Sequence, residues 1–410
     1  MIEIVISTGR ANPPKLDYSP RPLESAPALT NRDNAPANAP SYIRVLGSPA
    51  QNSRVPGSLR SGQWKVRWTA PTSKPPSTVL TAANRILVER SGGWTLFDNG
   101  GKQIAEGTGG QAVITIDPNA GMFYDLGSGN FLQAIALENG DLRFKVPLGH
   151  DESYRWPMFH RAGKRIIAVG IGQKRMSPKG QQPPPTSLFQ EIEVGTPLKL
   201  SPYKILLSLE SQQEMVFSEA TLVPVASGDI LWAVFPNLLI RTSSAETIDG
   251  AWSGSFKPLT ASADEAGWLY LVVALGDPPS GDRELWVITP DGRRTLRVPV
   301  PPAYSESRVP PVVGYDHRVY LRSSRSLVAF SPQGGLLWEA PIPSGIAGMS
   351  VTPDGQVVVG AGQEILSINP NGEVTHVAAL PAPASTSPVV TPEGEILVGT
   401  EAGVACLSVR

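Results

Sequence analysis

The sequence is poor in cysteine and in charge. Its 410 residues include one cysteine, Cys406, and charged side chains make up 17% of the chain, against about a quarter in an ordinary soluble protein. A single cysteine excludes an internal disulfide framework, a cysteine-based zinc site and an iron–sulfur site. The formal net charge of −1 gives no electrostatic attraction to nucleic acid or to an acidic membrane surface.

Long hydrophobic runs are also missing. No apolar run reaches the roughly 20 residues that a membrane helix needs. The opening residues Met1–Ser7 lack the basic segment and the long apolar stretch of a secretory signal, and Glu3 interrupts them. We therefore expect a protein of the cytoplasm, or of a particle assembled there, without a membrane span.

Glycine and proline, by contrast, are abundant, with 40 and 41 copies. Both residues interrupt long helices and favour short strands joined by turns. Turns of the type Thr-Pro-Asp-Gly begin at residues 289, 331 and 369, which are 42 and 38 residues apart. A second series begins at 352 and 391, and Asn-Gly turns near 99 and 139 are 40 residues apart. Short β-forming segments flank these turns.

A four-stranded unit that recurs about every 40 residues is typical of a β-propeller blade, whose apolar faces are buried when the blades stack. The sequence predicts an all-β, eight-bladed β-propeller, with seven blades as the alternative. The predicted units span 77–108, 111–149, 154–204, 216–259, 260–301, 308–343, 346–381 and 386–409, with a long exposed loop at 173–186.

The last unit has only three strands, because the sequence stops at Arg410. A spare strand containing Trp64, Val66 and Trp68 precedes the first unit and is similar to the fourth strands at 142–146 and 336–339. We expect it to pair with the strand that contains Val404 and Cys406 and so to close the ring. Closure leaves only short, protected edges.

Residues 1–60 are predicted to form an extended arm and lead-in, before a propeller at 61–410. Seven prolines fall in residues 1–40, a segment that buries too little apolar surface to fold alone. The β-forming residues at its tip favour a donor strand that adds to a neighbouring sheet, although a signal remnant or a frayed terminus explains them as well. The predicted partner-binding residues of the arm are Ile2, Ile4, Ile6, Leu16, Tyr18, Leu23 and Leu29.

The units resemble the pyrroloquinoline-quinone-like propeller repeat of the quinoprotein alcohol dehydrogenase family. The resemblance covers about residues 60–410 and is carried by Leu327–Phe330, Pro332–Gly334 and Trp338, and by Ser387–Val390 leading into Leu397–Gly399. It implies either a quinone-dependent dehydrogenase or a non-enzymatic scaffold, such as the propeller lipoprotein of the bacterial outer-membrane assembly machinery. The enzymes' paired cysteines and calcium ligands have no counterparts here. Trp338 and Trp68 match the tryptophans that join blades in those enzymes.

Candidate catalytic residues are few. His150, His160, His317 and His376 show no metal-ligand spacing, and Asp98, Asp117, Asp291 and Asp354 fit turns better than calcium loops. Arginines near 293–297 and 318–325 fit solvated edges better than an anion site. Cys406, Trp94, Trp232, Trp268 and Trp286 are expected in the core.

We therefore expect a non-catalytic propeller scaffold with no cofactor and no metal, held by its arm in a larger assembly of protein partners, for example a phage-like tail or an injection apparatus. The alternative is a divergent quinoprotein-like enzyme or a small-molecule-binding propeller with its site at the central funnel. A third possibility is an envelope-associated assembly factor whose signal was removed.

Overall fold

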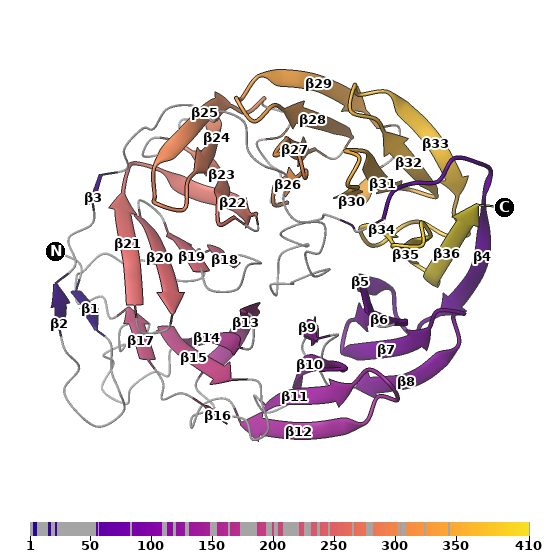
Figure 1. Ribbon diagram of the computed structural model, residues 1–410, viewed down its shortest axis with the longest axis horizontal. Coiled ribbons are helices and arrows are strands. Elements are labelled where there is room, and N and C mark those ends of the chain that lie inside the picture. Colours follow the sequence, from indigo (N-terminus) through magenta and orange to yellow (C-terminus); the bar gives the residue numbers. More distant parts are fainter. Residues whose placement is uncertain are drawn as a thin grey trace, which may run out of the picture. The chain divides into compact units, whose positions relative to one another are not determined.

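A computed structural model describes residues 3–5, 15–17, 21–22, 55, 57–82, 84–108, 113–117, 120–127, 131–147, 154–162, 165–172, 187–193, 199–200, 204–207, 221–224, 231–235, 238–244, 247–264, 266–275, 282–301, 304, 309–323, 325–342 and 345–409. Every named element within them is a β-strand (Figure 1). These residues contain no helix of the length and hydrophobicity that a bilayer crossing requires.

The chain divides into two compact units. Unit 1 comprises Met1–Ala28, Arg44–Gly47 and Pro147–Pro302, and unit 2 comprises Leu29–Ile43, Ser48–Val146 and Ala303–Arg410. In each unit, most strands pair antiparallel with the strand next to them along the chain.

Unit 2 contains five four-stranded sheets among the described residues. Their strands are β5 (Pro76–Ala82), β6 (Arg85–Arg90), β7 (Gly93–Asp98) and β8 (Gln103–Thr108); β9 (Val113–Asp117), β10 (Met122–Gly127), β11 (Phe131–Ala136) and β12 (Leu142–Pro147); β26 (Val312–Val313), β27 (Val319–Arg322), β28 (Ser326–Phe330) and β29 (Leu336–Pro341); β30 (Ile346–Val351), β31 (Val357–Ala361), β32 (Glu364–Ile368) and β33 (Val374–Ala379); and β34 (Val389–Val390), β35 (Ile396–Thr400), β36 (Gly403–Val409) and β4 (Trp64–Pro71).

Unit 1 contains three larger sheets and one two-stranded sheet among the described residues. Their strands are β13 (Tyr154–Ala162), β14 (Arg165–Gly172), β15 (Ser187–Glu193), β16 (Lys199–Leu200) and β17 (Lys204–Leu207); β18 (Thr221–Pro224), β19 (Leu231–Phe235), β20 (Leu238–Ser244), β21 (Thr247–Ser253) and β3 (Arg21–Pro22); β22 (Lys257–Ala263), β23 (Leu269–Ala274), β24 (Arg283–Ile288) and β25 (Arg294–Pro299); and β1 (Glu3–Val5) with β2 (Lys15–Asp17).

The predicted turns are confirmed, and their chemistry is uniform. In the turns that begin at residues 289, 331, 352, 369 and 391, the N–H of the fourth residue, a glycine, donates to the carbonyl of the first. Each of these glycines has a φ between 76° and 89°, a conformation that glycine adopts without a side-chain clash. The side-chain oxygen of the first residue accepts the N–H of the fifth, as in Thr352 with Gln356 and Asn369 with Glu373.

The core lies between adjacent sheets of each unit. In unit 2, one apolar cluster joins the sheet β26–β29 to the sheet β30–β33. Three others join β30–β33 to the sheet of β34–β36 and β4, that sheet to β5–β8, and β5–β8 to β9–β12. In unit 1, a cluster joins β18–β21 to β22–β25. Outer strands are more exposed: β31 is buried throughout, whereas β29 exposes four of its six residues. Each sheet therefore depends on its neighbours to bury its faces.

Among the described residues, the larger sheets begin and end within six residues of the boundaries predicted for the repeat units. This agreement has a local cause, because each unit carries its own turn residues and strand pattern. The predicted loop at 173–186 lies outside the described residues.

Candidate functional site

Strand β4, the first strand of the repeat region, is the outer strand of the sheet that contains β36. It pairs antiparallel with β36, with Cys406 opposite Trp68 and Leu407 opposite Val66. The register also places Val404 opposite Ala70 and Val409 opposite Trp64. Figure 1 shows indigo β4 alongside yellow β36, next to the C-terminus. The structure thus brings together the five residues that the sequence analysis assigned to closure.

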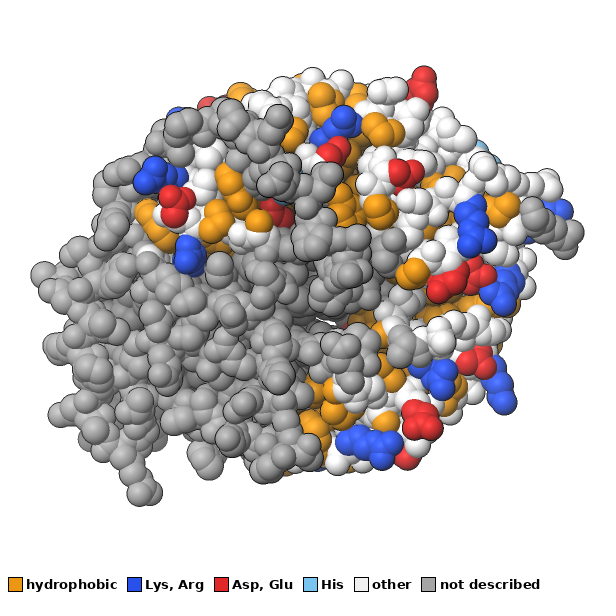
Figure 2. Space-filling model, in the orientation of Figure 1, with side chains coloured by type: hydrophobic (Ala, Val, Ile, Leu, Met, Phe, Trp, Pro, Cys, Tyr) orange, Lys and Arg blue, Asp and Glu red, His pale blue; other side chains and the backbone are white. Residues whose placement is uncertain are grey.

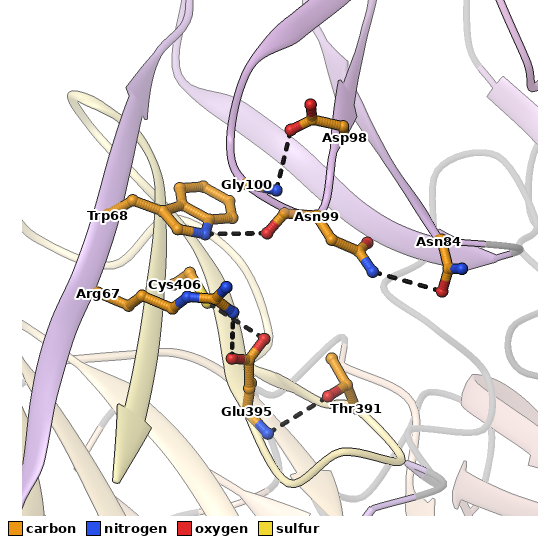
Figure 3. Close-up of polar contacts among 9 residues, drawn as sticks. All are labelled: Arg67, Trp68, Asn84, Asp98, Asn99, Gly100, Thr391, Glu395 and Cys406. Carbon is orange, nitrogen blue, oxygen red and sulfur yellow. Dashed lines mark hydrogen bonds and ion pairs between the residues drawn. The ribbon is translucent and has the colours of Figure 1, made fainter. Parts of the chain in front are cut away.

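A polar contact fixes β4 to the turn between β34 and β35. Arg67 forms an ion pair with Glu395, and the backbone N–H of Glu395 donates to Thr391 Oγ1 at 3.3 Å (Figure 3). The Arg67 side chain is 48% exposed, so the pair contributes at most about 1 kcal/mol. Cys406 is fully buried, with Sγ 3.8 Å from Glu395 Oε2. Burial and then the nearby carboxylate raise the pKa of its thiol to about 12.

Trp68 joins β4 to the next sheet. Its indole N–H donates to the Asn99 carbonyl at 3.1 Å (Figure 3). Its ring lies against Gly101, where a Cβ would fall 2.6 Å from the ring. Asp98 Oδ1 holds this turn by accepting the N–H groups of Gly100 and Lys102. Position 101 therefore requires glycine for two reasons: the Trp68 ring leaves no room for a side chain, and the backbone has a φ of 82°.

Trp338 repeats this arrangement, with its N–H on the Pro370 carbonyl at 3.1 Å and its ring on Gly372. Arg318 donates to the same carbonyl at 2.9 Å. Trp68 and Trp338 occupy equivalent places in β4 and β29. In both sheets, the pairing register shifts directly after the residue of the inner strand that lies opposite the tryptophan.

Two further tryptophans also place a ring near a glycine of the next sheet. Trp252 of β21 lies against Gly292 of the next sheet in unit 1. In unit 2, β8 carries Ala105 near the next turn, and the gap is filled by Trp94 of β7, which covers Gly107 and reaches Gly140. From the sequence, Trp68 and Trp338 were predicted to join sheets and Trp94 was expected in the core, whereas Trp252 was not singled out. The signal that sequence reasoning lacked was the glycine opposite each ring.

Before β4, the lead-in segment (residues 55–60) crosses three sheets of unit 2. The Val55 N–H donates to the Val351 carbonyl at 2.9 Å, and Tyr315 Oη donates to the Val55 carbonyl at 3.2 Å. The Gly57 N–H donates to the Val390 carbonyl at 3.2 Å. Val55 is fully buried.

Parts of the arm pair within the chain. Ile4 lies opposite Leu16 in the β1–β2 sheet. Arg21–Pro22 forms β3, which adds parallel to the outer edge of β21, opposite Trp252 and Ser253. No strand was expected at residues 21–22. Ile2, Ile6, Tyr18, Leu23 and Leu29 lie outside the described residues.

The other candidate polar residues serve turns and neighbouring strands. His376 is half-exposed, with Nε2 3.8 Å from Glu364 Oε1, and His317 is buried in a turn at a φ of 61°. Arg322 donates to the Ile346 carbonyl at 2.7 Å, and Arg293 pairs with Asp291 at 3.2 Å. Side chains of both signs are interspersed over the described part of the face in Figure 2. The described residues include no cluster of three or more potential metal ligands. His150 lies outside them, and His160 lies in β13.

Trp94, Trp232 and Trp286 are buried, as predicted, whereas Trp268 is half-buried. Asp125 of β10 is a buried carboxyl that the sequence analysis missed. It is 3% exposed, and burial raises its pKa to about 7, against opposing hydrogen bonds from the Leu126 backbone and the Trp94 side chain. Its position between hydrophobic strand residues gave no sign that a tryptophan from another sheet faces it.

No family model and no curated protein matches the sequence. Among solved structures, BamB from Moraxella catarrhalis is similar, with a TM-score of 0.55 at 12% identity over 85% of this chain and 98% of that chain. A streptogramin B lyase has a TM-score of 0.46 at 11% identity, over the same shares of the two chains. The likeness to BamB concerns the fold alone, and together with the four-stranded antiparallel sheets it shows that this chain has a β-propeller fold.

Proposed function

We propose that the protein is a non-catalytic scaffold, in which eight blades form one ring closed by β4 and the N-terminal arm attaches the ring to a larger protein assembly. We place this assembly in the cytoplasm or in a particle formed there. The pairing of β4 with β36 supports closure, since it joins the two ends of the repeat region in one sheet.

The scaffold proposal is supported by the polar side chains on the turns, which form hydrogen bonds to backbone groups. Asp98, Asn369 and Thr391 bind backbone groups of their own turns, and Arg318 and Trp338 bind a carbonyl of the neighbouring sheet. Side chains engaged in this way stabilise the stack of sheets and its surface. A rigid repeat region preceded by a long N-terminal arm suits attachment to a protein partner better than catalysis.

Deletion of residues 1–40 tests the arm. We expect the shortened protein to stay folded, because, among the described strand pairings with later parts of the chain, the deletion removes only the two-residue pairing of β3 with the edge of β21, and the described contacts of unit 2 begin at Val55. We expect it to lose its place in the native assembly. Density-gradient sedimentation of extracts from the native host reports assembly. Normal co-sedimentation of the shortened protein would contradict the role of the arm.

A separate measurement tests the absence of catalysis. Pyrroloquinoline quinone and calcium, added together at saturating concentration, should leave the melting temperature and the visible absorbance unchanged, because a ligand that binds the native state raises its stability. A rise in melting temperature, or quinone absorbance that stays with the protein after desalting, would refute the scaffold proposal and support the enzyme.

A further inference from the structure

The turn between β34 and β35, residues 391–395, is contacted by the incoming chain at three successive points. Gly57 lies against the first residue of this turn, so closely that a Cβ at position 57 would fall 1.8 Å from the Thr391 carbonyl oxygen. The side chain of Arg60 crosses Gly394, with Nε 2.8 Å from the place of a Cβ there. Arg67 forms its ion pair with Glu395.

The first two contacts belong to the lead-in segment and the third belongs to β4. The lead-in segment is held independently of β4, because Val55 bonds to Val351 and Tyr315 on other sheets. The turn is therefore contacted by two separate elements, the lead-in segment and β4.

Cys406 also lies close to this turn, through Glu395. Its sulfur is 3.8 Å from Glu395 Oε2, and its register partner on β4 is Trp68. Because Glu395 contacts both Arg67 and Cys406, a displacement of the turn alters the contacts that hold β4 on β36 (Figure 3).

From these contacts we infer that the 391–395 turn couples the lead-in segment to β4. The packing of the lead-in segment against this turn then determines how stably β4 stays paired with β36. Coupling of this kind is expected when two elements share one packed and hydrogen-bonded partner. The arm runs directly into the lead-in segment, so a partner that holds the arm tightens or loosens β4 through this turn. That last step rests on the proposed function, whereas the coupling itself does not.

Cys406 provides the assay, because it is the single cysteine of the chain and is fully buried beneath the β4 pairing. A maleimide in excess labels it only when β4 or its surroundings open, so the labelling rate of the folded full-length protein reports that opening. Gly57→Ala places a methyl group against the Thr391 carbonyl. We expect labelling to accelerate roughly tenfold, the scale that overpacking a closed site produces.

Gly345→Ala is the matched control, since a Cβ at position 345 meets no atom within 4 Å. It should leave the labelling rate unchanged. If Gly57→Ala also leaves the rate unchanged, or if both variants accelerate it equally, the inference is wrong. A melting temperature measured beside each rate shows whether the variant is folded. Should Gly57→Ala not fold, Arg60→Ala removes the second lead-in contact and takes its place.

A double-mutant comparison separates coupling from independent damage. Arg67→Ala should accelerate labelling by itself, and when combined with Gly57→Ala it should accelerate labelling by less than the product of the two single effects, because both act through one turn. Gly57→Ala combined with Arg85→Ala, which loses bonds to the Leu137 and Glu138 carbonyls instead, should show the full product. Full multiplication in both pairs would overturn the coupling.

These measurements use the isolated protein, so they do not depend on assembly. Loss of coupling with normal arm-dependent assembly would remove the inference and leave the proposed function intact. Coupling without arm-dependent assembly would do the reverse.

Discussion

Replacement of Asp125 by asparagine should make the protein more stable at pH 8 and leave it nearly unchanged at pH 4. The carboxyl is buried between two sheets, and its pKa rises from 3.8 to about 7 on folding. A pKa raised in the folded state means that this state binds more protons than the unfolded state between those values. The contribution of Asp125 to stability is therefore highest below about pH 4 and declines as the pH rises to 7.

The size of the effect follows from the same shift. One pKa unit corresponds to about 1.4 kcal/mol, so ionisation of Asp125 costs the folded state about 4 kcal/mol once the pH exceeds 7. Asparagine has nearly the same shape and keeps an oxygen that accepts the Trp94 indole hydrogen bond, but it cannot ionise. We expect the difference in unfolding free energy between variant and wild type to grow from near zero at pH 4 to about 4 kcal/mol at pH 8.

Urea denaturation followed by tryptophan fluorescence at pH 4, 6 and 8 measures this difference. Asp125→Ala is the control, because it removes the charge and also the hydrogen-bond acceptor. It should be less stable than Asp125→Asn at every pH and show the same change with pH relative to wild type. A difference between Asp125→Asn and wild type that stays constant from pH 4 to pH 8 would refute the reasoning.

Three other predictions concern the contacts between sheets. Trp338→Ala should lower the unfolding free energy by about 3 kcal/mol, whereas Leu336→Ala, on the same strand and 58% exposed, should change it by about 0.5 kcal/mol or less; chemical denaturation compares them, and equal losses would show that Trp338 does not join the sheets. Gly101→Ala should destabilise more than Gly121→Ala, because both have a positive φ but only Gly101 faces a ring; similar melting temperatures would place the effect in the backbone. Deletion of residues 63–71 should lower the melting temperature of the whole protein by removing β4 and exposing the edge of β36, and an unchanged value would show that β4 is dispensable.

The repeat could be predicted from the sequence because its determinants are local. Thr352, Asn369 and Thr391 each open a turn whose proline and glycine set the backbone, and the strands beside them carry the apolar residues. The pairing of the strand that contains Trp68 with the strand that contains Cys406 was also predictable, since a three-stranded last unit and a spare strand before the first unit leave one simple solution, but the register between them was not predicted.

The missed features depend on contacts between distant residues. Trp94 reaches Gly140 of the neighbouring sheet from β7, because β8 carries the small residue Ala105 near that turn. Only the fold shows that a tryptophan of one strand fills the space beside another. Asp125 has its side-chain hydrogen-bond partner, Trp94, on another sheet, and the two residues of β3 pair with β21 more than 200 positions later. No periodicity in a short window records such contacts.

A disulfide between β4 and β36 tests the central claim most directly. Lys65 and Ser408 are register partners, so Lys65→Cys with Ser408→Cys, in a Cys406→Ala background, should form a disulfide on mild oxidation and raise the melting temperature. Lys65→Cys with Arg143→Cys, on the outer strand of a different sheet, should not form one. Peptide mapping that finds no bond between positions 65 and 408, or finds the control bond as readily, would contradict the pairing of the N-terminal strand with the C-terminal strand.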